Sequence, residues 1–218
     1  MAKAALFKRI SMGCCGSVQE QGEFWQGALQ VRRSPHDVCA LLDDSEARFT
    51  VMQQLSAIQV QQGLCRSHTV QRDQKGGFSI DGVDSRGHAF KQYFTPLARA
   101  SCNGGTEYSK MCYVTTDGTT PTESNNFMSL RDCWIVHGSG PPGSCNITAS
   151  ANDFCMATCR CIAGAVKRST ALAYDRTLPE MGRLLENAGA VHGLGGPLLG
   201  QVQVQSPSAL ALGSPLDS

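Results

Sequence analysis

The chain has 218 residues, with 19 Lys and Arg against 18 Asp and Glu, and its formal net charge is +1 at pH 7. This near balance argues against a dedicated nucleic-acid-binding protein, whose binding face is usually strongly basic. The length is sufficient for one ordinary domain with extensions or for two small domains. No stretch approaches the roughly 18–20 apolar residues that a membrane-spanning helix needs, so the sequence predicts no transmembrane segment.

Residues 1–33 are interpreted as a flexible basic N-terminal segment. The first 17 residues contain Lys3, Lys8 and Arg9 and no acidic residue. Their apolar patch is shorter than the hydrophobic region of a secretory signal, so classical secretion is not expected. An organelle presequence and an uncleaved tail both fit this composition.

The same segment contains Met12-Gly-Cys-Cys, which resembles a lipidation motif with Gly13 as the myristoylated residue and Cys14 and Cys15 as palmitoylated residues. Myristoylation requires an N-terminal glycine, so this interpretation holds only if translation starts at Met12. A chance match and a buried thiol pair are the alternatives.

Residues 34–97 are predicted to form a small helical region followed by short strands. Ser34 followed by Pro35 is typical of a helix start, and Asp44 can cap a second helix that ends before Gly63. We therefore expect helical structure over residues 34–62. Short β-prone runs at residues 78–80 and 89–94 predict strands, the second ending at Pro96.

Residues 98–175 have a β-type pattern. Tyr113–Thr116 is a β-branched run that leads into Asp117-Gly118, a strong turn signal, and Pro121 then favours extended structure. The whole stretch, Cys112-Tyr-Val-Thr-Thr-Asp-Gly-Thr-Thr-Pro-Thr122, resembles the YYTTDGTTPT signature of the module at the C-terminus of chitobiases and β-hexosaminidases. A later run, Cys159–Lys167, resembles a strand of the same module.

The resemblance covers about residues 98–175 and implies an immunoglobulin-like or fibronectin-like β-sandwich with no chemistry of its own. The longer middle segment, residues 133–154, and the added cysteines depart from the pattern of that module. The resemblance also suggests a carbohydrate-binding accessory module, in which Trp134 stacks on a sugar, although a core tryptophan is the commoner role. Asn146 begins the sequon Asn-Ile-Thr and is the candidate glycosylation site.

Seven of the eleven cysteines lie within this module. If Phe154–Val166 is a strand, cysteines two residues apart lie roughly 6–7 Å apart, whereas a disulfide needs Cβ atoms about 4 Å apart. Each cysteine therefore needs a partner on another strand, and such disulfides favour an oxidising compartment such as an organelle lumen over the cytosol. The candidate disulfide cysteines are Cys102, Cys112, Cys133, Cys145, Cys155, Cys159 and Cys161.

Two other interpretations of these cysteines remain. Reduced cysteine is commonly buried as a small apolar residue. A thiol-ligated metal site would combine Cys155, Cys159 and Cys161 with His137, but this spacing does not match the paired spacings of common zinc sites. We therefore expect neither a metal nor a cofactor.

Residues 176–218 are predicted to form a short helix from Thr177 to about Glu186, followed by an extended or disordered tail. The tail is rich in Gly, Leu, Pro, Gln and Ser and has no charged residue between Glu186 and Asp217. Such a segment gains little by folding alone but can bury apolar area on a partner.

Taken together, the sequence predicts a mainly β protein: a cysteine-rich β-sandwich with a small helical N-terminal region and an extended C-terminal tail. No serine-hydrolase, metalloprotease or phosphate-binding motif is present, so we expect no catalytic residues and no enzyme activity. The expected function is that of a structural subunit that contacts other proteins through its N-terminal region and its tail. A carbohydrate-binding module and a thiol-ligated metal protein are the alternatives.

Overall fold

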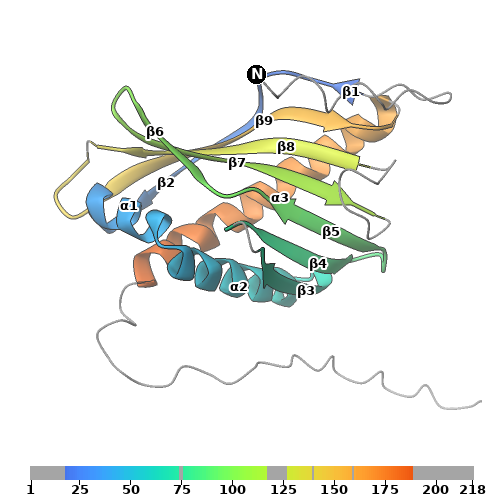
Figure 1. Cartoon of the computed structure of the whole chain (residues 1–218), viewed down its shortest axis with the longest axis horizontal. Helices are drawn as coiled ribbons and strands as arrows, with labels where there is room; N and C mark the ends of the chain where they lie inside the picture. Colours follow the sequence, from blue (N-terminus) through green and yellow to red (C-terminus); the bar gives the residue numbers. More distant parts are fainter. Residues whose placement is uncertain (1–17, 74–75, 117–126, 139, 159, 189–218) are drawn as a thin grey trace, which may run out of the picture.

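The computed structural model describes residues 18–73, 76–116, 127–138, 140–158 and 160–188. These residues form a large antiparallel sheet and three helices (Figure 1). In chain order the elements are β1 (Val18–Gln19), β2 (Glu23–Val31), α1 (Pro35–Asp43), α2 (Ser45–Gln61), β3 (Cys65–Arg72), β4 (Phe78–Asp84), β5 (Ala89–Phe94), β6 (Ala98–Cys102), β7 (Gly105–Thr115), β8 (Phe127–His137), β9 (Cys145–Met156) and α3 (Arg160–Asn187).

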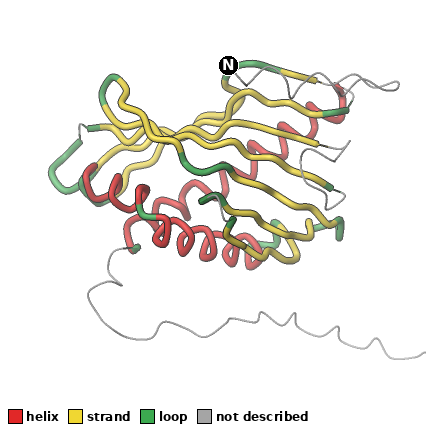
Figure 2. Tube along the Cα trace, in the orientation of Figure 1, coloured by secondary structure: helices red, strands yellow, loops and turns green. Residues whose placement is uncertain are grey.

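The sheet is continuous from one edge to the other in the order β1-β9-β8-β7-β5-β4-β3, with β2 also pairing with β9 and β6 also pairing with β7. All of these pairs are antiparallel. Helix α3 runs diagonally across the sheet, and α2 lies beside it (Figure 2). Helix α3 packs on both β2 and α2, so the main core lies between the sheet and these helices.

The predicted N-terminal helices are confirmed, together with their capping signals. The Ser34 hydroxyl accepts a hydrogen bond from the Asp37 amide at 3.1 Å, and Pro35 occupies the first turn of α1. The Asp44 carboxylate accepts hydrogen bonds from the amides of the first turn of α2, at 2.8 Å from Glu46. These contacts satisfy amides that have no partner within the helix, so the helix boundaries are encoded locally.

The mainly β character is confirmed, but the β-sandwich and the family resemblance are wrong. The strands of the predicted 98–175 module share one sheet with β3, β4 and β5, and this sheet packs on α3 through β2 and on α2 through β3. The expected second strand, Cys159–Lys167, lies almost entirely in the first turns of α3. Its small side chains satisfy a strand pattern and a helical pattern equally well, because alanine is also the best helix former.

The predicted C-terminal helix is the last third of α3, which begins at Arg160 and continues through Pro179. A helix that begins at Thr177, as the sequence predicts, would place Pro179 in its first turn, where proline is tolerated. Here it lies inside the helix, on an exposed position. The signature-turn residues, the lipidation motif and the tail lie outside the described residues: Asp117, Gly118, Pro121, Gly13, Cys14, Cys15 and 189–218.

The alternation of buried and exposed side chains along β9 shifts by one residue near its end. Residues 145, 147, 149 and 151 of β9 are buried, and burial then shifts to Phe154. Between them Asp153 has a φ of 54°, and the pairing of β9 with β8 shifts register between Asn152 and Cys155. This is the signature of a β-bulge, which bends the strand and keeps Phe154 on the buried side.

No helix in the described part of the chain is long and apolar enough to cross a membrane.

The close pairing of β7 and β8 at their ends predicts opposite results for two neighbouring glycines. A Cβ atom on Gly105 would lie 2.2 Å from the Val136 carbonyl oxygen, whereas a Cβ atom on Gly138 would meet only the Gly104 carbonyl oxygen, at 3.6 Å. We expect Gly105→Ala to lower the free energy of unfolding by about 1–3 kcal/mol, the usual cost of overpacking. Urea unfolding of this variant and of the Gly138→Ala control checks the prediction, and equal midpoints would contradict it.

Candidate binding cavity

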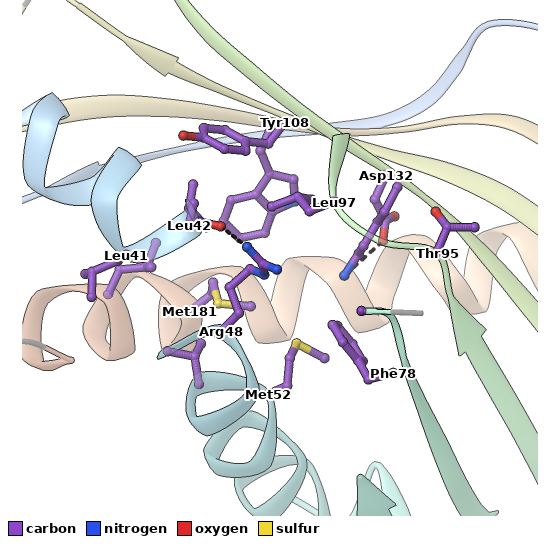
Figure 3. A pocket seen from close by; sticks show the side chains of 15 residues that line it. Leu41, Leu42, Arg48, Met52, Phe78, Thr95, Leu97, Tyr108, Asp132 and Met181 are labelled. Atoms are coloured by element: carbon purple, nitrogen blue, oxygen red, sulfur yellow. Dashed lines mark hydrogen bonds and ion pairs between the residues drawn. The ribbon is translucent and has the colours of Figure 1, made fainter. Parts of the chain in front are cut away.

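A cavity of about 290 Å³ lies between the inner face of the sheet and helices α2 and α3. A smaller cavity of about 70 Å³ adjoins it, towards α1 and the start of α2 (Figure 3). Five residues line both spaces, which places the two cavities side by side: Met52, Lys110, Asp132, Trp134 and Met181. Most of the remaining lining residues are apolar, among them Leu55, Ile80, Phe94, Met128, Leu130 and Leu185.

Lys110 and Asp132 bring charge into this apolar interior. They are directly opposite each other in the register of β7 and β8. Tyr108 and Cys112, two residues before and after Lys110, are buried on the same face, as is Leu130 beside Asp132. Because side chains alternate along a strand, both charged groups occupy positions that the pattern assigns to apolar residues.

The Lys110 ammonium has few partners. Its Nζ atom lies 3.8 Å from Asp132 Oδ2, which is too long for a hydrogen bond, and its side chain is only 16% exposed. Nζ also lies 4.4 Å from the centre of the Phe94 ring and 5.3 Å from that of Phe78. Cation–π contacts of this kind stabilise a lysine, but its three N–H donors have no hydrogen-bond acceptor among the described residues.

Asp132 is held from the helix side by Tyr174 of α3. The Tyr174 hydroxyl donates a hydrogen bond to Asp132 Oδ1. Burial raises the pKa of Asp132 above its usual value, while the Lys110 charge and the Tyr174 hydroxyl act in the opposite direction. Burial likewise raises the pKa of Tyr174, and the neighbouring Asp132 charge adds to this. Tyr174 is therefore a neutral donor throughout the physiological pH range.

The position of Tyr174 is fixed by Trp25 of β2. The two rings stack with their centroids 4.7 Å apart and an interplanar angle of 20°. The Trp25 indole Nε1 donates a hydrogen bond to Asp175 Oδ1 at 2.7 Å. Stacking and hydrogen bonding together fix the rotation of α3 about its axis relative to β2, so the Tyr174 hydroxyl stays directed at Asp132.

Arg48 brings a second cation to the smaller cavity. Its guanidinium donates a hydrogen bond to the Leu42 carbonyl oxygen near the end of α1, and Figure 3 shows it directed into the space beside Met52. Arg48 is half-buried. Within the described part of the chain it has no carboxylate partner. Donors of the guanidinium thus remain available to the cavity.

The sequence analysis missed Lys110, Asp132 and Arg48. A usable signal existed for the first two, because each interrupts an alternating buried pattern with a charge: Tyr108-x-Lys110-x-Cys112 and Leu130-x-Asp132-x-Trp134. Trp134, which the sequence analysis considered as a sugar platform or a core tryptophan, lines both cavities.

The predicted disulfides are not formed among the described cysteines. Cys102, Cys112, Cys133, Cys145 and Cys155 carry free thiols, while Cys159 and the side chain of Cys161 lie outside the described residues. The strand register explains this result. It places Cys112 opposite Phe94 and Leu130, Cys133 opposite Ser109 and Ser150, and Cys155 opposite Gln19 and Ser129, so none of the three faces another cysteine.

Burial makes several of these thiols poor nucleophiles. It raises the pKa of Cys65 to about 11, and it also raises the pKa values of Cys112 and Cys133. Since the thiolate is the reactive form, these cysteines fit the interpretation of apolar filler. Cys112 is the only one of the predicted cysteines that lines either cavity in the described structure.

No group of three or more His, Cys, Asp or Glu side chains among the described residues is placed to hold a metal ion. The proposed ligand set of Cys155, Cys159, Cys161 and His137 lies partly outside those residues. The His137 Nε2 atom lies 2.8 Å from the Thr148 hydroxyl.

Asn146 of the sequon is exposed on β9, opposite Gln30 of β2, and its glycosylation stays a prediction.

No protein-family model and no curated protein matches the chain. Among solved structures, truncated norcoclaurine synthase from Thalictrum flavum is similar at 16% identity with a TM-score of 0.46, over 81% of this chain and 96% of that one. A protein from Arthrobacter aurescens is similar at 6% identity with a TM-score of 0.42, over 84% and 92% of the two chains. Ara h 8.0201 is similar at 10% identity with a TM-score of 0.38, over 82% and 100%. Values this low transfer no activity or ligand to this chain.

The contact between Tyr174 and Asp132 predicts a pH-dependent stability effect. We expect Tyr174→Phe to lower the free energy of unfolding at pH 7 by about 1.5–3 kcal/mol, the usual worth of a hydrogen bond to a charged group. The Tyr174 hydrogen bond lowers the pKa of Asp132 against the larger effect of burial, so it stabilises the ionised carboxylate, and this contribution is lost as the pH falls and Asp132 becomes protonated. The cost of Tyr174→Phe should therefore shrink as the pH falls through the pKa of Asp132.

Urea unfolding of Tyr174→Phe, Asp132→Asn and the double variant measures this coupling. Contacting residues give a cycle energy above about 0.5 kcal/mol. Additive effects of the two substitutions, unchanged by pH, would show that the hydroxyl does not act through Asp132.

The free thiols predict the result of differential alkylation. After denaturation without reductant, we expect complete labelling of Cys102, Cys112, Cys133, Cys145 and Cys155 in peptide maps, equal to that of a pre-reduced control. In the native protein Cys112 should react more slowly than Cys102, because Cys112 is buried and Cys102 is only half-buried. Labelling of any of these five that appears only after reduction would show a disulfide.

Proposed function

We propose that the chain binds a largely apolar small molecule in the paired cavities between the sheet, α2 and α3. The observation that carries this proposal is the Lys110 ammonium, which lies inside an apolar cavity without a hydrogen-bond acceptor among the described residues. Small-molecule sites are typically concave and mostly apolar, with a few polar groups that fix orientation, and have volumes of roughly 300–1,000 Å³. The larger cavity, at about 290 Å³, is close to the lower end of this range.

The lining supports apolar recognition with one polar end. Met52, Met128 and Met181 come from α2, β8 and α3, and methionine adapts its shape to irregular contacts. Lys110 and Asp132 supply a cation and an anion where the two cavities meet, and Tyr174 holds the anion in place. A bound molecule thus gains apolar burial along its body, at about 25 cal/mol per Å², and hydrogen bonds at one end.

The expected role as a subunit of a larger assembly is a separate proposal that stays open. It rests on the helical N-terminal region, which forms α1 and α2, and on the tail, of which residues 189–218 lie outside the described residues. Among the described residues, the exposed large apolar side chains are Ile162 and Leu172, both on α3. The expectation that the chain is not an enzyme also stays a prediction.

A neutral fluorescent probe tests binding in the cavity. We expect N-phenyl-1-naphthylamine to bind wild-type protein with a dissociation constant on the order of micromolar, as apolar burial in a small cavity allows. Ala173→Phe should weaken this binding by roughly tenfold or more, because Ala173 lines the larger cavity and a phenyl ring would occupy it. Fluorescence titration gives both constants.

Ala165→Phe is the matched control, because Ala165 is on the same helix at an exposed position. It should bind the probe as wild type does, and circular dichroism establishes that both variants fold. Absence of probe binding to the wild type, or equal binding by Ala173→Phe, would refute the proposal.

A further inference from the structure

The two cavities contain more positive than negative charge among their lining residues. Arg48 and Lys110 are the cations, and Asp132 is the acid. The acidic residues next to Arg48 in the chain already have partners. Asp43 pairs with Arg99 at 2.6 Å, Asp44 caps α2, and Glu46 pairs with Arg72. An uncompensated cation beside an apolar cavity points to an anion supplied by the ligand.

We infer that the ligand is an amphiphilic monocarboxylate whose carboxylate binds between Arg48 and Lys110, with its apolar body in the larger cavity. This inference rests on the proposed function and names its ligand class. Arg48 lines the smaller cavity, and Lys110 lines both, so a headgroup in the smaller cavity can reach both cations. A guanidinium suits this role because its planar donors match the two oxygens of a carboxylate.

Asp132 determines the side of Lys110 on which the headgroup binds. Its carboxylate would repel a second carboxylate placed next to it, but its Oδ1 atom is turned to Tyr174 on α3. The 3.8 Å separation from Lys110 leaves the ammonium donors free to turn towards Arg48. The carboxylate of the ligand therefore binds on the Arg48 side of Lys110.

A neutral apolar ligand fits these groups less well. It would cover the half-buried Arg48 without supplying an anion, and a buried charge without a partner is costly. A ligand with an amine would add a third cation to the same space. Both comparisons favour a carboxylate over an alcohol, an ester or an amine with the same chain.

Displacement of bound N-phenyl-1-naphthylamine by a matched ten-carbon series tests the inference at constant pH and ionic strength. The competitors are decanoate, decan-1-ol, methyl decanoate and decylamine. Wild-type protein is expected to bind decanoate roughly tenfold more tightly than decan-1-ol, as one charge-assisted hydrogen bond provides. Arg48→Gln and Lys110→Gln should each reduce this ratio several-fold, while Arg48→Lys should retain part of it.

Arg66→Gln is the control for loss of an arginine. Arg66 is exposed on β3 and, like Arg48, donates a hydrogen bond to a backbone carbonyl, that of Ser85 at 3.2 Å. This variant should keep the full preference for decanoate. If Arg48→Gln does not fold, the wild-type series and Lys110→Gln decide the question.

The outcomes separate the two proposals. If the probe binds but decanoate and decan-1-ol displace it equally, or if the preference survives both substitutions, the carboxylate inference is overturned and cavity binding stands. If wild-type protein does not bind the probe, cavity binding itself fails, and the inference fails with it.

Discussion

The interior is organised by the pairing of Lys110 with Asp132 across β7 and β8. Two charges on the inner face of a sheet oppose folding unless they compensate each other, because removing ions from water costs several kcal/mol per ion. Register places the two side chains opposite each other, and the Tyr174 hydroxyl supplies the hydrogen bond that the carboxylate needs.

Contacts with β2 and the segment after it place α3 on the sheet. Trp25 stacks on Tyr174 and bonds to Asp175, so two consecutive residues of the helix are fixed by one tryptophan of β2. At the far end of α3, the Arg33 guanidinium donates to the Glu186 carbonyl oxygen at 3.0 Å, and the Glu186 carboxylate accepts from the Arg32 amide at 2.9 Å. The helix is thus held at its middle and at its end, while the stretch between them lines the cavity.

The sequence was informative where structure is decided locally. The caps at Ser34 and Asp44 gave both N-terminal helices, and the β-branched run at Tyr113–Thr116 gave the end of β7. The turn motif after it misled, because a tight turn with flanking strands fits many β folds. The cavity could not be predicted, for a different reason. Lys110 and Asp132 become neighbours only through the register of β7 and β8, which local sequence patterns do not encode.

A cavity lined by two cations and one acid carries an excess positive charge, which is a cost that the empty protein must bear. Replacing buried charged groups by well-packed apolar residues often leaves a protein equally or more stable, so the presence of these groups indicates a role other than stability. Sites where local rules are broken without structural gain are typically functional. Arg48 strengthens this reasoning, because the α1 carbonyl that it contacts uses only part of a guanidinium's donors. An anion from outside the chain would satisfy both Arg48 and Lys110, and its binding would stabilise the folded state by mass action.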